Sequence, residues 1–176
     1  MRNTIPLAAL CGLIVAGPAG AVERRGGTEA EYAQIQAFHD RSIATYNAGD
    51  IDSSMADYLE RLRVLGIKSA RITGREGMRR DALKSAASGR SRLVAEIEEM
   101  EVNGSGLGAW AYMICRYAFV SIPNDASRPP SAISDGRYTA LLSKTADGWK
   151  VLLDIDNGGA GAAPDLVEKL RKEIAR

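Results

Sequence analysis

The hydrophobic period of the chain changes once, near Leu93, and this change constrains the fold most strongly. Before it, apolar side chains such as Ile35, Phe38 and Ile43 recur at the spacing of a helix. After it, apolar side chains alternate or run continuously over short segments bounded by Gly, Pro, Asn and Asp. Helices followed by strands are typical of an α+β domain. The 176 residues suggest one such domain.

Three helices are predicted before the strands. The first begins at Thr28, because Thr28 and Glu31 have the spacing of a capping box, and it ends at Gly49, which suits a left-handed cap. The second begins at Asp50 or Asp52 and turns a set of apolar residues inward. That set is Met55, Tyr58, Leu59 and Leu62.

A short strand is expected over residues 69–72, followed by the third helix. Thr73 and Glu76 suggest a second capping box at its start, and it ends near Gly89. Its apolar side is predicted to consist of Met78, Ala82 and Ala86.

Four main strands are predicted from Leu93 onward, at residues 93–102, 109–121, 136–144 and 149–156. Asp147 and Gly148 indicate a tight hairpin between the last two. The loop over 123–135 is long for a plain connection and suggests a lid or an interface loop. A linker of small residues at 158–163 leads to a charged helix at 165–175, which we expect to be loosely attached.

The first 21 residues have the pattern of a secretory signal peptide. Arg2 precedes an apolar stretch, and Ala19-Gly20-Ala21 has the small side chains that a signal peptidase requires. Cleavage after Ala21 would export the chain to the periplasm or medium and leave 22 basic and 22 acidic residues. One thiol, Cys115, would remain, so no internal disulfide is expected. No apolar run in the mature chain reaches the ~20 residues of a membrane span.

Three segments together resemble the nuclear transport factor 2-like (NTF2-like) superfamily, and its SnoaL-like branch in particular. They are "YNAGDIDSSMADYL" at 46–59, "ITGREGMRR" at 72–80 and "GRYTALLSKTADGWKVLLDID" at 136–156. The resemblance implies a cone over residues 22–157: a curved antiparallel sheet wrapped around the first helix, with two further short helices and an interior pocket. It also implies homodimers formed through the sheet.

The family includes isomerases, cyclases, dehydratases, binding modules and oligomerisation domains, so the fold does not give the function. In the ketosteroid isomerase-like branch, a tyrosine on the first helix and a general-base aspartate carry the chemistry. These positions correspond to Ser42 and Gly66 here. The sequence therefore argues against that particular isomerase activity.

His39 and Asp154 are the candidate catalytic residues. His39 is the only histidine and points with the apolar stripe of the first helix, so it is either a proton shuttle or a hydrogen-bonded core residue. Asp154 and Asp156 share one face of the last strand, opposite Val151, Leu153 and Ile155. They are either pocket carboxylates, one a general base, or partners of Arg116 and Arg137 in ion pairs across the sheet.

The remaining predicted pocket residues come from the first helix and the strands. They are Ser42, Tyr46, Trp110, Tyr112, Arg116, Tyr138 and Asp156. The strand at 109–121 is apolar on both faces, and the sequence leaves open which face lines the pocket and which meets a second subunit. Cys115 is expected to be an inert core thiol.

Residues 61–92 contain ten Lys or Arg and two acids, but no aromatic residues interleave with them, so nucleic acid is not an expected partner. No metal-ligand spacing is present, and neither a metal nor another cofactor is expected. The sequence favours an exported, homodimeric domain that binds a small apolar or aromatic molecule. The alternatives are an acid–base enzyme acting on such a molecule and an interaction domain with a filled core.

Overall fold

The computed structural model describes residues 21–66 and 71–175. The predicted signal peptide therefore lies outside the described residues except for Ala21, and so do residues 69 and 70 of the strand expected at 69–72. Within the described ranges, no helix has the length and apolar character needed to cross a membrane.

The first helix, α1 (Glu29–Ala48), has both predicted ends. The Glu31 amide donates to the Thr28 side chain while the Glu31 carboxylate accepts from the Thr28 amide, which completes the capping box. At the other end Gly49 has φ 71°, a left-handed conformation that glycine adopts without strain. These local signals fix where α1 starts and stops.

The second helix is shorter than predicted. α2 (Ile51–Ala56) ends at Asp57, and β2 (Tyr58–Leu65) follows it directly. The prediction that Tyr58, Leu59 and Leu62 belong to a helix is wrong, because β2 pairs in parallel with the last strand and buries Leu62 in the core.

The third helix, α3 (Arg75–Ser88), follows the two-residue strand β3 (Ile72–Thr73). The predicted capping box is absent, since Thr73 pairs with Arg63 in the sheet and Gly74 is the cap without a side-chain bond. α3 has no fully buried residue, and only Met78 of its predicted apolar side packs against the core.

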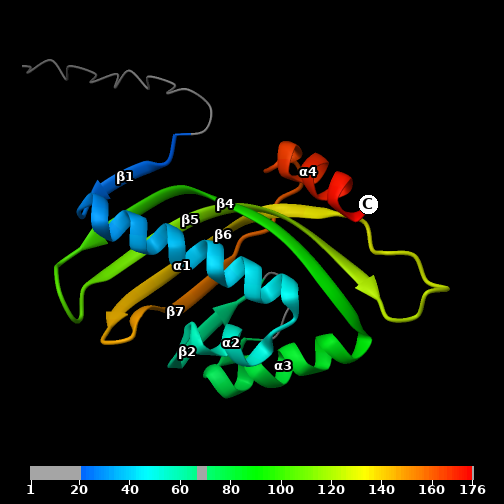
Figure 1. Cartoon of the computed structure of the whole chain (residues 1–176), viewed down its shortest axis with the longest axis horizontal. Helices are drawn as coiled ribbons and strands as arrows, with labels where there is room; N and C mark the ends of the chain where they lie inside the picture. The colour runs from blue at the N-terminus through cyan, green and yellow to red at the C-terminus, as the bar shows by residue number, and fades with distance from the viewer. Residues whose placement is uncertain (1–20, 67–70, 176) are drawn as a thin grey trace, which may run out of the picture.

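One seven-stranded sheet forms the body of the molecule, in the order β1-β4-β5-β6-β7-β2-β3. Its centre is antiparallel as predicted, whereas β1 pairs in parallel with β4, and β2 pairs in parallel with β7. The strands not yet given are β1 (Glu23–Gly26), β4 (Gly89–Asn103), β5 (Trp110–Pro123), β6 (Ser134–Thr145) and β7 (Gly148–Asp156). Figure 1 shows this sheet curving behind α1, which crosses its concave face.

The core lies between α1 and the concave face of the sheet. Tyr32, Ile35 and Phe38 of α1 pack against strand residues such as Met100 and Leu142. The C-terminal end of α1 is joined to β4 by Asn47, whose side chain accepts from the Leu93 amide and donates to the Leu93 carbonyl, each at 2.8 Å. Asn47 therefore holds α1 across the sheet, which gives a structural role to the "NAGD" segment.

The C-terminal helix α4 (Pro164–Ile174) lies on the opposite, convex face (Figure 1). Leu166 and Leu170 are buried there against Val94, Ala118 and Val120. The expectation of a loosely attached helix is wrong, because α4 covers the outer apolar side chains at one end of β4 and β5.

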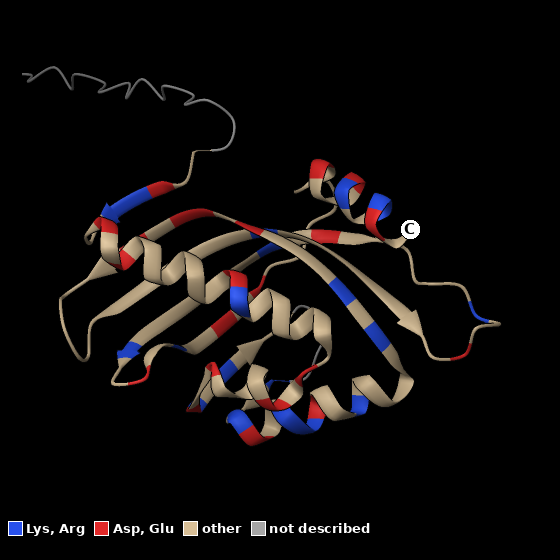
Figure 2. Ribbon diagram, in the orientation of Figure 1, with Lys and Arg blue, Asp and Glu red and all other residues tan. Residues whose placement is uncertain are grey.

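Figure 2 shows Lys and Arg along α3 and the first part of β4, with acidic residues following on β4. Two of these charges are paired at the surface: Arg79 of α3 with Asp52 at 3.0 Å, and Glu98 of β4 with Arg137 of β6 at 2.6 Å. The basic segment is thus a solvated surface in part balanced by neighbouring acids.

Candidate functional site

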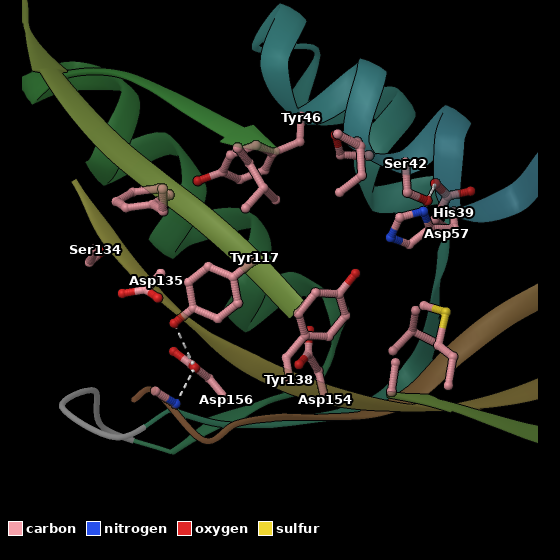
Figure 3. Close-up of a pocket in the computed structure, with 18 of the residues that line it drawn as sticks. His39, Ser42, Tyr46, Asp57, Tyr117, Ser134, Asp135, Tyr138, Asp154 and Asp156 are labelled. Atoms are coloured by element: carbon pink, nitrogen blue, oxygen red, sulfur yellow. Dashed lines mark hydrogen bonds between the residues drawn. The ribbon is translucent and has the colours of Figure 1, made fainter. Parts of the chain in front are cut away.

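A cavity of about 830 Å³ lies between α1 and the concave face of the sheet. Its wall is mainly apolar and aromatic, with contributions from Phe38 and Ile43 on α1 and from Met113 and Phe119 on β5. Polar side chains enter it at a few points, chiefly from α1, β6 and β7 (Figure 3). Of the predicted site residues, His39, Ser42, Tyr46, Tyr138, Asp154 and Asp156 line this cavity.

His39 stands in the α1 wall of the cavity and is only 2% exposed. Its Nδ1 lies 3.5 Å from the Asp40 carboxylate, while its Nε2 is buried without a hydrogen-bond partner among the described residues. Burial lowers the pKa of His39, and the nearby Asp40 carboxylate offsets part of that shift. The imidazole is therefore neutral at pH 7, with one ring nitrogen unsatisfied.

Ser42 is one turn further along α1 and is held by the buried carboxylate of Asp57. The Ser42 hydroxyl donates to one Asp57 oxygen at 2.5 Å, and Arg41 donates to the other at 2.8 Å. This pair links α1 to the residue between α2 and β2. Both Ser42 and Asp57 are thus satisfied by protein atoms and form a fixed corner of the cavity.

Asp154 and Asp156 enter the cavity from β7. The other β7 residue on their face is not the one that simple alternation predicts. The register of β7 against β6 shifts between Val151 and Leu153, so that an extra residue is accommodated there. Val151 therefore lines the cavity together with the two acids, and the prediction that it shares a face with Leu153 and Ile155 is wrong.

Asp154 has an environment that favours its neutral form. Burial, followed by the charge of Asp156, raises the pKa of Asp154 to about 7. No described residue donates a hydrogen bond to its carboxylate, whereas Asp156 accepts from the Tyr117 hydroxyl at 2.9 Å and from the Gly158 amide at 3.0 Å. The alternative of ion pairs to Arg116 and Arg137 is wrong, because these bind Glu96, Asp165 and Glu98 instead.

The tyrosines of the cavity are neutral donors. Burial is the first cause that raises the pKa of Tyr138 and of Tyr58, and the charge of Asp154 adds to both shifts. Figure 3 shows Tyr138 and Asp154 side by side on the sheet wall, with His39 on the facing wall formed by α1. A neutral imidazole, whose pKa is lowered by burial, and a carboxyl group, whose pKa is raised to about 7, thus face one cavity.

Trp110, Tyr112 and Arg116 do not line the cavity, and their assignment to it is wrong. They alternate with Ala111, Met113 and Cys115, which are buried on the concave side, so they point to the convex face. There Trp110 is 45% exposed, Tyr112 donates to Glu99 at 2.5 Å and Arg116 pairs with Glu96 at 2.6 Å.

Six polar lining residues were not predicted: Ser54, Asp57, Tyr58, Tyr117, Ser134 and Asp135. Tyr117 could have been found, because it shares a face with Met113 and Cys115 in the sequence. Asp57 and Tyr58 could not, because their segment also fits a helical period. Asp135 lines the cavity on the side of the exposed residues Gly159 and Ala160, which we call the mouth, and its carboxylate accepts from the amides of Gly161 and Ala163.

Comparisons with known proteins identify the architecture. No family model and no curated protein matches the sequence. Solved structures do match, among them a ketosteroid isomerase-like protein from Erwinia carotovora atroseptica, with TM-score 0.61, 18% identity and coverage of 74% of this chain and 98% of that one. A second is an NTF-2 like protein of unknown function from Shewanella oneidensis, with TM-score 0.57, 18% identity and coverage of 71% and 97%.

The chain has the NTF2-like fold. The α+β cone expected from the sequence is confirmed, with its curved sheet around an N-terminal helix. A domain of cystatin-like fold from Nostoc punctiforme is also similar, with TM-score 0.57, 19% identity and coverage of 84% and 88%. In this NTF2-like cone the cavity occupies the space between helix and sheet. The fold does not define the chemistry of the cavity, which depends on the residues that line it.

Proposed function

We propose that this NTF2-like domain binds a small apolar or aromatic molecule in the cavity between α1 and the sheet. The observation that carries the proposal is the cavity itself, which measures about 830 Å³ and has a mainly apolar wall. Binding pockets for small molecules are typically ~300–1,000 Å³ in volume, mostly apolar and supplied with a few polar groups. An interaction domain with a filled core would not need such a space.

Titration with the neutral fluorophore N-phenyl-1-naphthylamine tests this proposal. Ala140 lies in the cavity wall and is 1% exposed, so Ala140→Leu adds bulk to the cavity itself. Ala86→Leu makes the same change at an exposed position of α3 and is the matched control. We expect saturable binding to the wild type and the control, and weaker binding to a folded Ala140→Leu. Equal binding to all three would place the probe elsewhere and contradict the proposal.

A second candidate function is acid–base catalysis on such a molecule, and Asp154 favours it. Its raised pKa of about 7 suits a general base at neutral pH, and the unpartnered His39 Nε2 faces the same cavity. The test is deuterium incorporation from D₂O into a panel of enolisable cyclic ketones. Exchange that rises with pH through 7 and is lost in Asp154→Asn supports catalysis. Exchange equal to that of buffer alone leaves ligand binding as the function.

We also propose export and self-association for this chain. The predicted cleavage after Ala21 would leave Val22 next to β1, so processing preserves the whole sheet. N-terminal sequencing of the exported protein should give Val22, and retention of Met1 would contradict export with cleavage. For self-association we consider the apolar side chains of the convex face that lie outside the cluster buried by α4, and we call them the outer patch. It comprises Trp110, Ile114, Leu141 and Leu153.

A further inference from the structure

We propose that the cavity selects an organic cation, an apolar ring system that carries a protonated amine, and that Asp154 holds the ammonium group. This inference rests on the proposed ligand binding and names the chemical class of the ligand. It follows from the charges that line the cavity, from the hydrogen-bonding needs of its buried groups and from the aromatic rings beside Asp154.

Among the residues that the structure describes, every ionised side chain that lines the cavity is acidic. Four carboxylates reach the wall, those of Asp57, Asp135, Asp154 and Asp156, and neither Lys nor Arg is among the described lining residues. A wall of one charge sign, with apolar surfaces around it, concentrates the opposite charge and excludes the same charge. A carboxylate or phosphate ligand would meet repulsion here, and the described part of the wall has no cation to offset it.

The four carboxylates differ in what already satisfies them. Arg41 neutralises Asp57 through a contact of 2.8 Å. Asp135 and Asp156 accept hydrogen bonds from backbone amides and from Tyr117, which are neutral donors. Asp154 has no donor among the described residues. The cavity therefore presents one carboxylate whose hydrogen-bonding capacity is free, beside two whose charge is uncompensated.

His39 indicates independently that the ligand carries a hydrogen-bond donor. Its ring is 2% exposed, lines the cavity, and has a buried Nε2 without a partner among the described residues. The Asp40 carboxylate near Nδ1 can only accept, so the proton of the neutral ring belongs on Nδ1. Nε2 is then an acceptor, and it needs an N–H or O–H group that a ligand can supply (Figure 3).

Aromatic rings complete the cation site. Tyr117 and Tyr138 line the cavity with ring centroids 6.2 Å apart, and Figure 3 shows them beside Asp156 and Asp154. The face of an aromatic ring attracts an ammonium ion, most strongly where water is excluded. Apolar rings, a free carboxylate and unsatisfied acceptors together fit an amine on an apolar body better than a neutral or anionic molecule of the same shape.

Three naphthalenes of nearly equal size test the proposal: 1-naphthylmethylamine, which is protonated at pH 7.5, neutral 1-naphthalenemethanol and anionic 1-naphthoate. Affinities are measured by calorimetry. We expect the amine to bind about 10-fold or more tightly than the alcohol, as a charge-assisted contact allows, and the carboxylate to bind most weakly. Asp154→Asn should remove most of the preference for the amine while changing the affinity for the alcohol less than about 3-fold.

Asp147→Asn is the matched control, because Asp147 is an exposed carboxylate in the turn between β6 and β7. It should leave the preference for the amine intact. Equal affinity for amine and alcohol, or a preference for naphthoate, would overturn the cation site while leaving ligand binding in place. A preference that survives Asp154→Asn would overturn the role of Asp154. Failure of all three compounds to bind would overturn both this inference and the proposed function.

Discussion

Asp154 and Asp156 face the same cavity from alternate positions of β7, yet among the described residues only Asp156 has hydrogen-bond donors. The Tyr117 hydroxyl and the Gly158 amide both donate to the Asp156 carboxylate, whereas the Asp154 carboxyl group faces the cavity without a donor among the described residues. Two residues of one strand thus have different tasks. Asp156 anchors the mouth of the cavity, and Asp154 supplies a carboxyl group whose charge depends on pH.

Asp154→Asn should stabilise the protein, and more so at higher pH. The folded state raises the pKa of Asp154 from 3.8 to about 7, so the folded protein holds this proton more tightly than the unfolded chain. The resulting penalty is absent below pH 3.8, grows as the pH rises, and is constant above about 7. We expect the variant to gain about 1–3 kcal/mol in free energy of unfolding at pH 8, and less at pH 5.

Urea unfolding of the wild type and Asp154→Asn at several pH values between 5 and 8 measures this gain. The groups that face Asp154 are Asp156 on β7, Tyr138 on β6, Cys115 and Tyr117 on β5, Tyr58 on β2 and His39 across the cavity on α1. Burial lowers the pKa of His39, which lines the same cavity, so His39→Gln is measured in parallel. A pH-independent difference between wild type and Asp154→Asn would contradict the raised pKa.

The sequence predicted those features of the fold that depend on local interactions. The ends of α1 followed from Thr28, Glu31 and Gly49, because a capping box and a left-handed glycine act within a few residues. The hairpin at Asp147 and Gly148 followed from turn chemistry in the same way.

Features set by distant pairing could not be predicted. The spacing of Met55, Leu59 and Leu62 fits a helix, and only pairing of β2 with β7 makes the segment after Asp57 a strand. The register shift in β7 turns Val151 to the same face as Asp154, and no residue type in the sequence indicates that shift. Both faces of β5 are apolar because α4 covers one end of the convex side, so alternation alone could not tell which face lines the cavity.

Asn47→Ala should destabilise the domain by about 1–3 kcal/mol, because it leaves the amide and carbonyl of Leu93 without their partner. The loss also frees the C-terminal end of α1 from β4. Thermal and urea unfolding measure the effect. Asn157→Ala, at an exposed position after β7, is the matched control and should change stability by less than about 0.5 kcal/mol. Equal effects of the two changes on stability would contradict the role of Asn47 as a bridge between α1 and β4.

Gly136→Ala should destabilise the mouth of the cavity. A Cβ atom at Gly136 would lie 2.9 Å from the Gly158 Cα and from the Tyr117 ring, so one of them has to move. We expect a loss of about 1–3 kcal/mol in unfolding free energy from this overpacking. Gly77→Ala in α3, where the added Cβ makes only an ordinary contact at 3.4 Å, should be neutral or slightly stabilising. A neutral Gly136→Ala would show that the mouth is not tightly packed.

The mature protein should be a dimer in solution, because the outer patch leaves Trp110 45% exposed beside other apolar side chains. Light scattering at micromolar concentration should give twice the mass of one mature chain. Ile114→Lys places a charge in the outer patch and should shift the protein to the monomer. Thr73→Lys, at an exposed position of β3, should leave the mass unchanged. A wild-type monomer would contradict self-association and would mean that α4 covers enough of the convex face to leave no interface.

The most direct test of ligand binding is a crystal structure of the mature protein soaked with N-phenyl-1-naphthylamine. We expect one probe molecule per chain between α1 and the sheet, with its rings against Phe38 and Tyr138 and its N–H directed to a cavity acceptor. The protein side chains around it should keep their positions, because the cavity of about 830 Å³ exists before binding. A cavity closed by its own side chains, or a probe found only on the outer patch, would contradict the proposed function.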